Sequence, residues 1–100
     1  MIFRRRFADL VGRQLDLFER EEAELLRDSE AAKRAYDAAG RDEAEARYSA
    51  YLDLIELGTD RLAELRDAYA AALEEHAAAE YEAAFHRGVR KRLPRFALEA

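Results

Sequence analysis

The chain has 100 residues, the length of one domain, and 39% of them are charged, against about a quarter in an average globular domain. It contains no cysteine, which excludes disulfide bonds, thiolate metal sites and cysteine nucleophiles. No apolar stretch approaches the roughly 20 residues of a membrane span, and the basic start is not followed by the apolar segment of a secretory signal. We therefore expect one cytoplasmic domain over residues 1–100.

The residue types favour helix along the whole chain. Alanine, leucine and charged residues dominate, while four glycines and one proline leave few natural breaks. Valine and isoleucine, which favour strands, are scarce. The sequence therefore predicts an all-α fold made of long amphipathic helices.

The clearest interior break is at Gly40. This glycine suits the left-handed position that ends many helices, and Asp42 can cap a following helix. We expect helix 1 at about residues 2–39 and helix 2 at about residues 42–75. A short turn between them produces a long antiparallel hairpin.

A third helix is expected at about residues 78–93, and a tail at residues 94–100. Pro94 prevents the helix from continuing, because the residue before a proline is biased away from helical geometry. No breaker lies in the alanine run 77–79, so the sequence leaves open that helix 2 continues straight into this segment.

Apolar residues recur in helices 1 and 2 in alternating steps of three and four, the pattern of a left-handed antiparallel coiled coil. The facing pairs are predicted to be Tyr36–Ala44, Ala32–Tyr48, Ser29–Tyr51, Leu25–Ile55, Glu22–Gly58, Phe18–Leu62, Leu15–Leu65 and Val11–Tyr69. Small side chains face large ones at several levels, as good packing requires. Ser29 and Tyr51 are also expected to form a hydrogen bond.

The first half of helix 1 has a second apolar row that a two-helix hairpin leaves exposed: Phe3, Phe7, Leu10 and Leu17. The third helix can cover it with a row of its own: Ala78, Tyr81, Phe85, Val89 and Leu93. The sequence therefore predicts a three-helix bundle of up-down-up topology. Gly88 is expected on the exposed face of the third helix, where alanine is tolerated, and Phe96 and Leu98 are expected to pack on the bundle or on a partner.

The third helix is too short to cover the whole hairpin. Near Gly40 the two helices project alone and carry Leu26, Leu54 and Leu57 outside the seam. An apolar strip of this kind indicates a partner surface, and two hairpins can cover each other in a four-helix bundle. The sequence therefore predicts a homodimer, and the same strip is a candidate surface for another protein.

Several acidic and histidine side chains are candidate metal ligands. Glu22 occupies a seam position, whereas His76 with Glu80, and Glu82 with His86, are pairs four residues apart on one helical face. The alternative, which we prefer, is a carboxylate at the edge of the seam and two solvent-exposed Glu–His pairs. Neither histidine follows a glutamate by three residues, as the Glu-x-x-His motif of di-iron bundles requires.

Both ends of the chain are basic and its middle is acidic. The basic patch consists of Arg4, Arg5, Arg6, Arg87, Arg90, Lys91 and Arg92. It is a candidate surface for nucleic acid or an anionic membrane, but the formal net charge of −5 argues against nucleic acid. Asp16, Glu19, Glu21 and Glu22 of helix 1 are expected to lie near enough to neutralise part of it.

The sequence contains no nucleophilic triad, glycine-rich phosphate loop or paired catalytic carboxylates, so we expect neither an enzyme nor a cofactor. The leading hypothesis is a small structural or protein-interaction module that forms a homodimer through the projecting hairpin. One alternative is a metal- or ligand-binding bundle assembled at a dimer interface. The other is association with nucleic acid or an anionic membrane through the basic ends.

Overall fold

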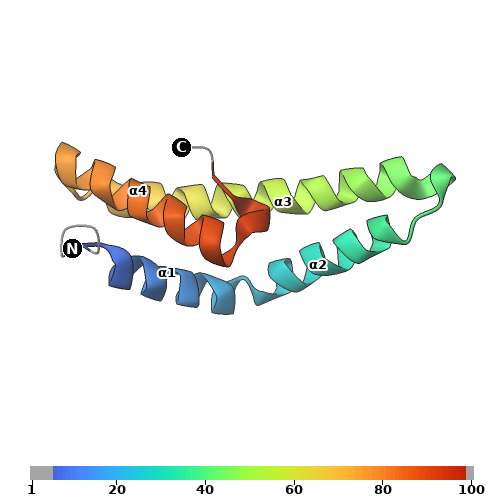
Figure 1. Cartoon of the computed structure of the whole chain (residues 1–100), viewed down its shortest axis with the longest axis horizontal. Helices are drawn as coiled ribbons and strands as arrows, with labels where there is room; N and C mark the ends of the chain where they lie inside the picture. The colour runs from blue at the N-terminus through green and yellow to red at the C-terminus, as the bar shows by residue number, and fades with distance from the viewer. Residues whose placement is uncertain (1–5, 99–100) are drawn as a thin grey trace.

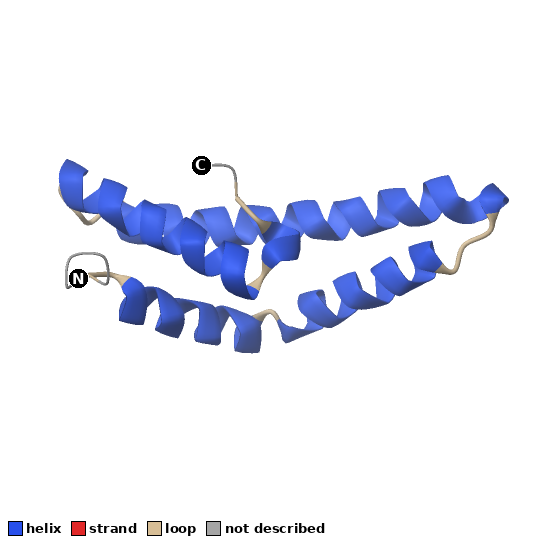
Figure 2. Ribbon diagram, viewed as in Figure 1, coloured by secondary structure: helices blue, strands red, loops and turns tan. Residues whose placement is uncertain are grey.

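The computed structural model describes residues 6–98, and every regular element within them is helical (Figure 2). Four α-helices follow one another: α1 (Ala8–Glu21), α2 (Ala23–Asp37), α3 (Arg41–Ala70) and α4 (Glu75–Arg92). A short 3-10 turn, η2 (Pro94–Phe96), comes after α4. The all-α prediction is confirmed.

The fold is elongated, with extents of 51 × 23 × 21 Å. α1 and α2 form one bent arm, α3 runs back beside it, and α4 returns along part of α3 (Figure 1). α2 packs against α3, whereas α1 packs mainly against α4, which also contacts α3. Three helices therefore share a core at one end of the molecule, and only α2 and α3 continue to the other.

The predicted first helix, residues 2–39, is two helices in the structure. Regular helix stops at Glu22, whose backbone has φ −107° and ψ 26°, although neither proline nor glycine lies there. The bend follows from the position of α4. α1 has to leave room for that helix, while α2 closes onto α3 where no third helix intervenes. Residues 2–5 of the predicted helix lie outside the described part of the chain.

The turn at Gly40 is in the predicted place but has a different geometry. Gly40 has φ −78° and ψ 174°, and no residue within 6–98 has a positive φ. Gly40 is therefore the extended N-cap of α3, and the prediction of a left-handed helix end is wrong. Asp42 lies in the first turn of α3, not at the cap, where its charge still complements the helix dipole.

The chain does break between α3 and α4, at residues 71–74, and the alanine run 77–79 lies within α4. The carboxylate of Glu74 accepts hydrogen bonds from the backbone N–H groups of His76 and Ala77, at 3.0 and 2.6 Å. These two bonds hold the pKa of the Glu74 carboxyl below its ordinary value. Glu74 thus caps α4, which begins at Glu75, three residues before the predicted start.

The core lies where α1, α3 and α4 meet, and the C-terminal segment closes it. Its buried members are Phe7, Val11, Leu15, Phe18, Leu62, Ala70, Ala77, Tyr81, Ala84, Phe85, Val89, Phe96 and Leu98. The Tyr81 hydroxyl donates to Oε1 of Gln14 at 2.9 Å, and burial raises the pKa of this phenol. The apolar rows predicted for the first and third helices therefore supply much of the core, although Leu17 is exposed and Phe3 lies outside the described residues.

Gly88 lies at the contact between α4 and α1, so its predicted place on an exposed face is wrong. A Cβ atom at Gly88 would lie 2.8 Å from Cγ1 of Val11 and 3.1 Å from Cδ1 of Leu15. The two helices approach closely because this position has no side chain.

Two side-chain contacts across the hairpin join residues about one turn further along α3 than the predicted partners. The Tyr36 ring is 5.0 Å from the ring of Tyr48, four residues beyond Ala44. Glu22 pairs with Arg61, three residues beyond Gly58. Gly58 itself is covered by the ring of Phe96, so the C-terminal segment fills the place that the sequence assigned to Glu22.

Candidate functional site

Glu22, the strongest candidate metal ligand in the sequence, forms an ion pair in the structure. Its carboxylate accepts a hydrogen bond from the Arg61 guanidinium, which reaches it from α3. Glu22 also sits at the junction of α1 and α2, so this pair ties the bend to α3. A glutamate held by an arginine is a poor metal ligand, because metal binding has to displace the cation.

His86 lies between α4 and α3 and is partly buried. Its Nε2 accepts a hydrogen bond from Nη1 of Arg66 at 3.0 Å, which requires a neutral imidazole. Burial first, and then the positive charge of Arg66, lower the pKa of His86, whereas Glu82 acts in the opposite direction. His86 therefore acts as a hydrogen-bond acceptor in the packing of these helices.

His76 is largely exposed, with 83% of its side chain accessible, and lies 3.5 Å from Glu80. Arg6 reaches the same carboxylate at 3.1 Å. Within residues 6–98, no three His, Asp or Glu side chains are arranged to hold a metal ion. The structure thus keeps Glu22 with Arg61 and His86 with Arg66, both apart from the His76–Glu80 pair.

The residues of the basic patch differ in their contacts and exposure. Arg4 and Arg5 lie outside the described residues, and Arg6 is paired with Glu80. Arg87, Arg90 and Lys91 are exposed near the end of α4. Of the patch residues that the structure describes, these last three are exposed and form no ion pair within residues 6–98.

Arg92 is bound within the fold. Its guanidinium donates to Asp16 at 2.7 Å, to Glu19 at 3.0 Å and to the carbonyl of Gly12 at 3.0 Å. The hydrogen bond to Asp16 is the main cause of the raised pKa of Arg92. The expectation that acids of the first helix neutralise part of the patch is confirmed for Asp16 and Glu19 at Arg92, whereas Glu22 pairs with Arg61 of α3.

The three leucines predicted to form an interface differ in their exposure. Leu57 keeps 40% of its surface exposed, and Leu54 is half-buried. Leu26 is half-buried and packs against the edge of the core. Two further exposed apolar side chains of α3, Tyr48 and Leu52, were not among the predicted interface residues.

Leu54 and Leu57 belong to a longer row on α3, which we call the outer α3 face. Alternating steps of three and four residues connect its members: Leu54, Leu57, Arg61, Glu64, Ala68 and Ala71. All of them except Leu54 are exposed, Ala71 is the C-cap of α3, and the acids Asp53 and Asp60 flank the row. Beside it, a groove of about 380 Å³ separates α3 from α1 and contains the Glu22–Arg61 pair.

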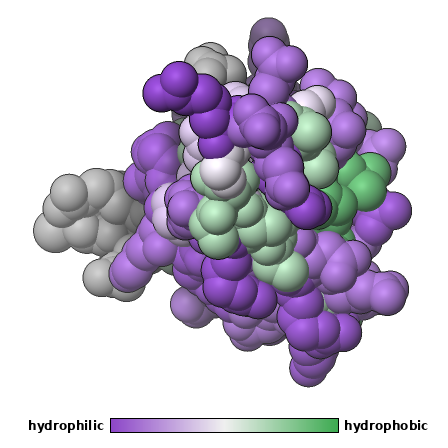
Figure 3. Space-filling view, turned by 90° about the vertical axis from the view of Figure 1, so that its right-hand side faces the viewer, coloured by the Kyte–Doolittle hydropathy of each residue, from purple (hydrophilic) through white to green (hydrophobic). Residues whose placement is uncertain are grey.

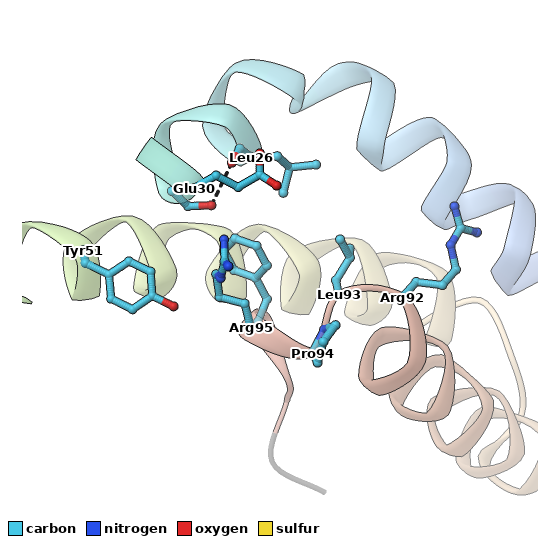
Figure 4. Close-up of a pocket in the computed structure, with 9 residues that line it drawn as sticks. Leu26, Glu30, Tyr51, Arg92, Leu93, Pro94 and Arg95 are labelled. Atoms are coloured by element: carbon cyan, nitrogen blue, oxygen red, sulfur yellow. Dashed lines mark hydrogen bonds between the residues drawn. The ribbon is translucent and has the colours of Figure 1, made fainter. Parts of the chain in front are cut away.

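A larger groove of about 530 Å³ lies where the C-terminal segment meets α2 and α3, and we call it the C-terminal groove. It is lined by Leu26, Ser29, Glu30, Tyr51 and the stretch 92–96. Figure 4 shows Leu26 and Glu30 on α2 across from Arg95. The Ser29 hydroxyl donates to the Leu26 carbonyl at 2.9 Å, so its predicted hydrogen bond to Tyr51 is absent from this groove.

Comparison with known proteins does not assign the chain to a family. No family model, curated protein sequence or solved structure shows a significant match to it. Within residues 6–98, no helix combines the length and the apolar composition needed to cross a bilayer. The outer α3 face and the C-terminal groove are the two candidate binding surfaces of the fold.

Sequence reasoning missed the C-terminal groove because it treated residues 94–100 as a tail. The structure places Phe96 in the core at 2% exposure and also buries Leu98, as expected for residues that pack on the bundle. One signal was present in the sequence. Gly58 is a small residue in the middle of an apolar seam, and such a position can accept an aromatic ring from elsewhere in the chain.

Proposed function

We propose that the protein is a small helical interaction module that forms a homodimer through the outer α3 face. The observation that carries the proposal is the 40% exposure of Leu57 in the middle of the longest helix. α1 and α2 act together as one arm, so that each monomer is an up-down-up bundle of three arms. Figure 3 looks onto the Gly40 end of the hairpin, where hydrophilic residues surround a central apolar area.

The outer α3 face is complementary to itself when two copies run antiparallel. With a two-fold axis between Leu62 and Ala63, Leu57 of one copy lies level with Ala68 of the other, and Leu54 lies level with Ala71. Arg61 then lies level with Glu64 of the second copy. The two-fold axis repeats this pair, so the dimer contains two of them. Large side chains meet small ones and opposite charges meet, as a stable antiparallel pair requires.

The same geometry predicts a weak dimer. Asp53 and Asp60 flank the face in both copies, so like charges come near each other at its edge. Arg61 already binds Glu22 and has to share its guanidinium with the second copy. We expect a reversible monomer–dimer equilibrium, measurable by sedimentation equilibrium, with a dissociation constant on the order of tens of micromolar.

Engineered cysteines test the contact, because the natural chain contains none. Two single variants, Leu57→Cys and Ala68→Cys, are mixed in equal amounts and oxidised at concentrations where the dimer is populated. In the proposed register the two positions are level and form a mixed disulfide. Each variant alone forms little disulfide, because its two copies of the same residue lie about 16 Å apart along the helices, at ~1.5 Å per residue.

Mass spectrometry separates the mixed disulfide from the two homodisulfides. A dominant mixed product supports the antiparallel register, and Leu57→Asp, which places a charge opposite the apolar Ala68 of the second copy, should then return the protein to a monomer. A monomeric mass at several hundred micromolar overturns the proposed function. A dimer that gives no mixed disulfide, and that Leu57→Asp leaves intact, overturns the outer α3 face as its contact.

A further inference from the structure

The C-terminal groove has the size and lining of a small-molecule site, and it is separate from the surface proposed for dimerisation. Its volume of about 530 Å³ falls within the range of ~300–1,000 Å³ found for ligand pockets. Leu26, Leu93 and Phe96 supply apolar surface, and the first two are only partly covered by the protein itself. An apolar group of a ligand can complete their burial.

The basic side chains around this groove differ in whether they are free to bind an anionic ligand. Arg92 is occupied by Asp16, Glu19 and the Gly12 carbonyl, so it stiffens the wall and has little capacity for a ligand. Nζ of Lys33 donates hydrogen bonds to both carboxylate oxygens of Asp37, at 2.8 and 2.9 Å. Lys33 is close enough to Arg95 for their positive charges to repel each other.

Arg95 is in a different position. Its guanidinium carbon lies 5.9 Å from the centre of the Tyr51 ring, and no carboxylate within residues 6–98 pairs with it. The aromatic face steers the guanidinium over the groove without neutralising it. Arg95 can therefore donate to an anion with two parallel hydrogen bonds.

Among residues 6–98, Glu30 is the only acid lining the groove, and it lies on the opposite wall, on α2 (Figure 4). Among the described residues it forms no ion pair, with Arg95 or with any other cation. An anionic ligand is therefore attracted to the Arg95 side and repelled from the Glu30 side. This polarity orients the ligand along the groove.

We propose that the C-terminal groove binds a small amphipathic anion, a carboxylate or sulfonate joined to an aromatic or aliphatic body. The anionic group pairs with Arg95, and the apolar body lies against Leu26, Leu93 and Phe96. The groove is formed within one chain, so binding does not require the dimer.

Two probes test the site on the full-length protein: the aromatic sulfonate 1-anilinonaphthalene-8-sulfonate, followed by fluorescence, and octanoate as its competitor. We expect the sulfonate to bind one equivalent, octanoate to displace it, and sodium sulfate at matched ionic strength to leave it bound. Arg95→Gln is expected to weaken binding about tenfold, the effect of losing one charge-assisted contact. Glu30→Gln is expected to strengthen binding, because it removes the repulsion.

Arg20→Gln is the matched control, since Arg20 is an exposed arginine of α1 outside this groove. It should leave the affinity for both probes unchanged. The proposal is overturned if the wild-type protein binds neither probe at 1 mM, which is roughly the weakest affinity of interest. It is equally overturned if Arg95→Gln and Arg20→Gln have the same effect, or if Glu30→Gln weakens binding. All three variants change exposed side chains, and circular dichroism checks that each retains its helices.

Discussion

Phe96 occupies the space that a side chain at Gly58 would need. A Cβ atom built on Gly58 overlaps the edge of the Phe96 ring, and this ring is 2% exposed. The contact joins the middle of the longest helix to a segment that follows the last helix. It explains why a glycine, which weakens a helix interior, stands at this point of α3.

Gly58→Ala is therefore expected to destabilise the protein. Alanine favours the helix by about 1 kcal/mol, but displacing Phe96 forfeits up to about 2–3 kcal/mol of apolar burial. The net loss should be about 1–2 kcal/mol in the free energy of unfolding, measured by urea denaturation followed by circular dichroism.

The double variant shows whether Phe96 is the cause. In a Phe96→Ala background the ring is absent, so Gly58→Ala should become stabilising and the sign of its effect should reverse. If Gly58→Ala destabilises equally in both backgrounds, the overlap with Phe96 is not the reason for the glycine.

Gly88 and Gly12 provide a matched pair of interior helix glycines. A Cβ at Gly88 meets Val11 at 2.8 Å, whereas a Cβ at Gly12 has no neighbour within 4 Å. Gly12→Ala should raise the free energy of unfolding by roughly 0.5–1 kcal/mol through helix propensity. Gly88→Ala should lower it by about 1 kcal/mol, because crowding of the α1–α4 contact outweighs the same gain. Thermal and urea unfolding of both variants measure the difference, and equal shifts would contradict the close approach of these helices.

The stability of the fold should decline as the pH falls below about 6.5, the ordinary pKa of histidine. Burial and Arg66, with a smaller contribution from Arg90, lower the pKa of His86 in the folded state, and Glu82 opposes them only in part. The unfolded chain therefore binds a proton at His86 more readily than the folded chain does. This contribution to stability is complete above the unfolded pKa and is lost as the pH falls from there toward the folded pKa.

Urea midpoints measured between pH 7.5 and pH 5 test this dependence. The exposed His76 is the control, so His76→Gln should keep the slope of stability against pH that the wild-type protein shows. His86→Gln should flatten it. If His76→Gln flattens the slope of stability against pH and His86→Gln does not, the Arg66–His86 contact does not determine the pH response.

Local sequence signals located most of the helical segments but not their long-range relations. The turn at Gly40 and the end of α4 before Pro94 both depend on nearby residues, and both are where the sequence predicts them. The bend at Glu22 has no local signal, because it is caused by the length of α4. The alternating three- and four-residue spacing continues through the bend, and it therefore predicts a single helix over residues 2–39.

Two contacts across the hairpin differ from the predicted pairs for a similar reason. Counting from Gly40 assumes a regular pair of helices, and the assumption fails once Phe96 enters the seam at Gly58 and Glu22 reaches Arg61. The predicted interface leucines agree with the structure to different degrees. Leu57 is exposed as the interface prediction requires, but Leu26 belongs to the C-terminal groove, which depends on how a distant segment folds back.

Asp60→Asn should strengthen self-association. Asp60 is exposed at the edge of the outer α3 face, where the proposed dimer brings it toward acids of the second copy. Removing one such repulsion on each chain should tighten the dimer roughly two- to fivefold at low salt, and the gain should shrink as salt screens the charges. Asp28→Asn makes the same change of charge on the exposed surface of α2 and should leave the association constant unchanged. Sedimentation equilibrium on the two variants separates a local effect from one of net charge. If both variants strengthen association equally, net charge alone governs association. Asp60 then does not lie at the dimer contact.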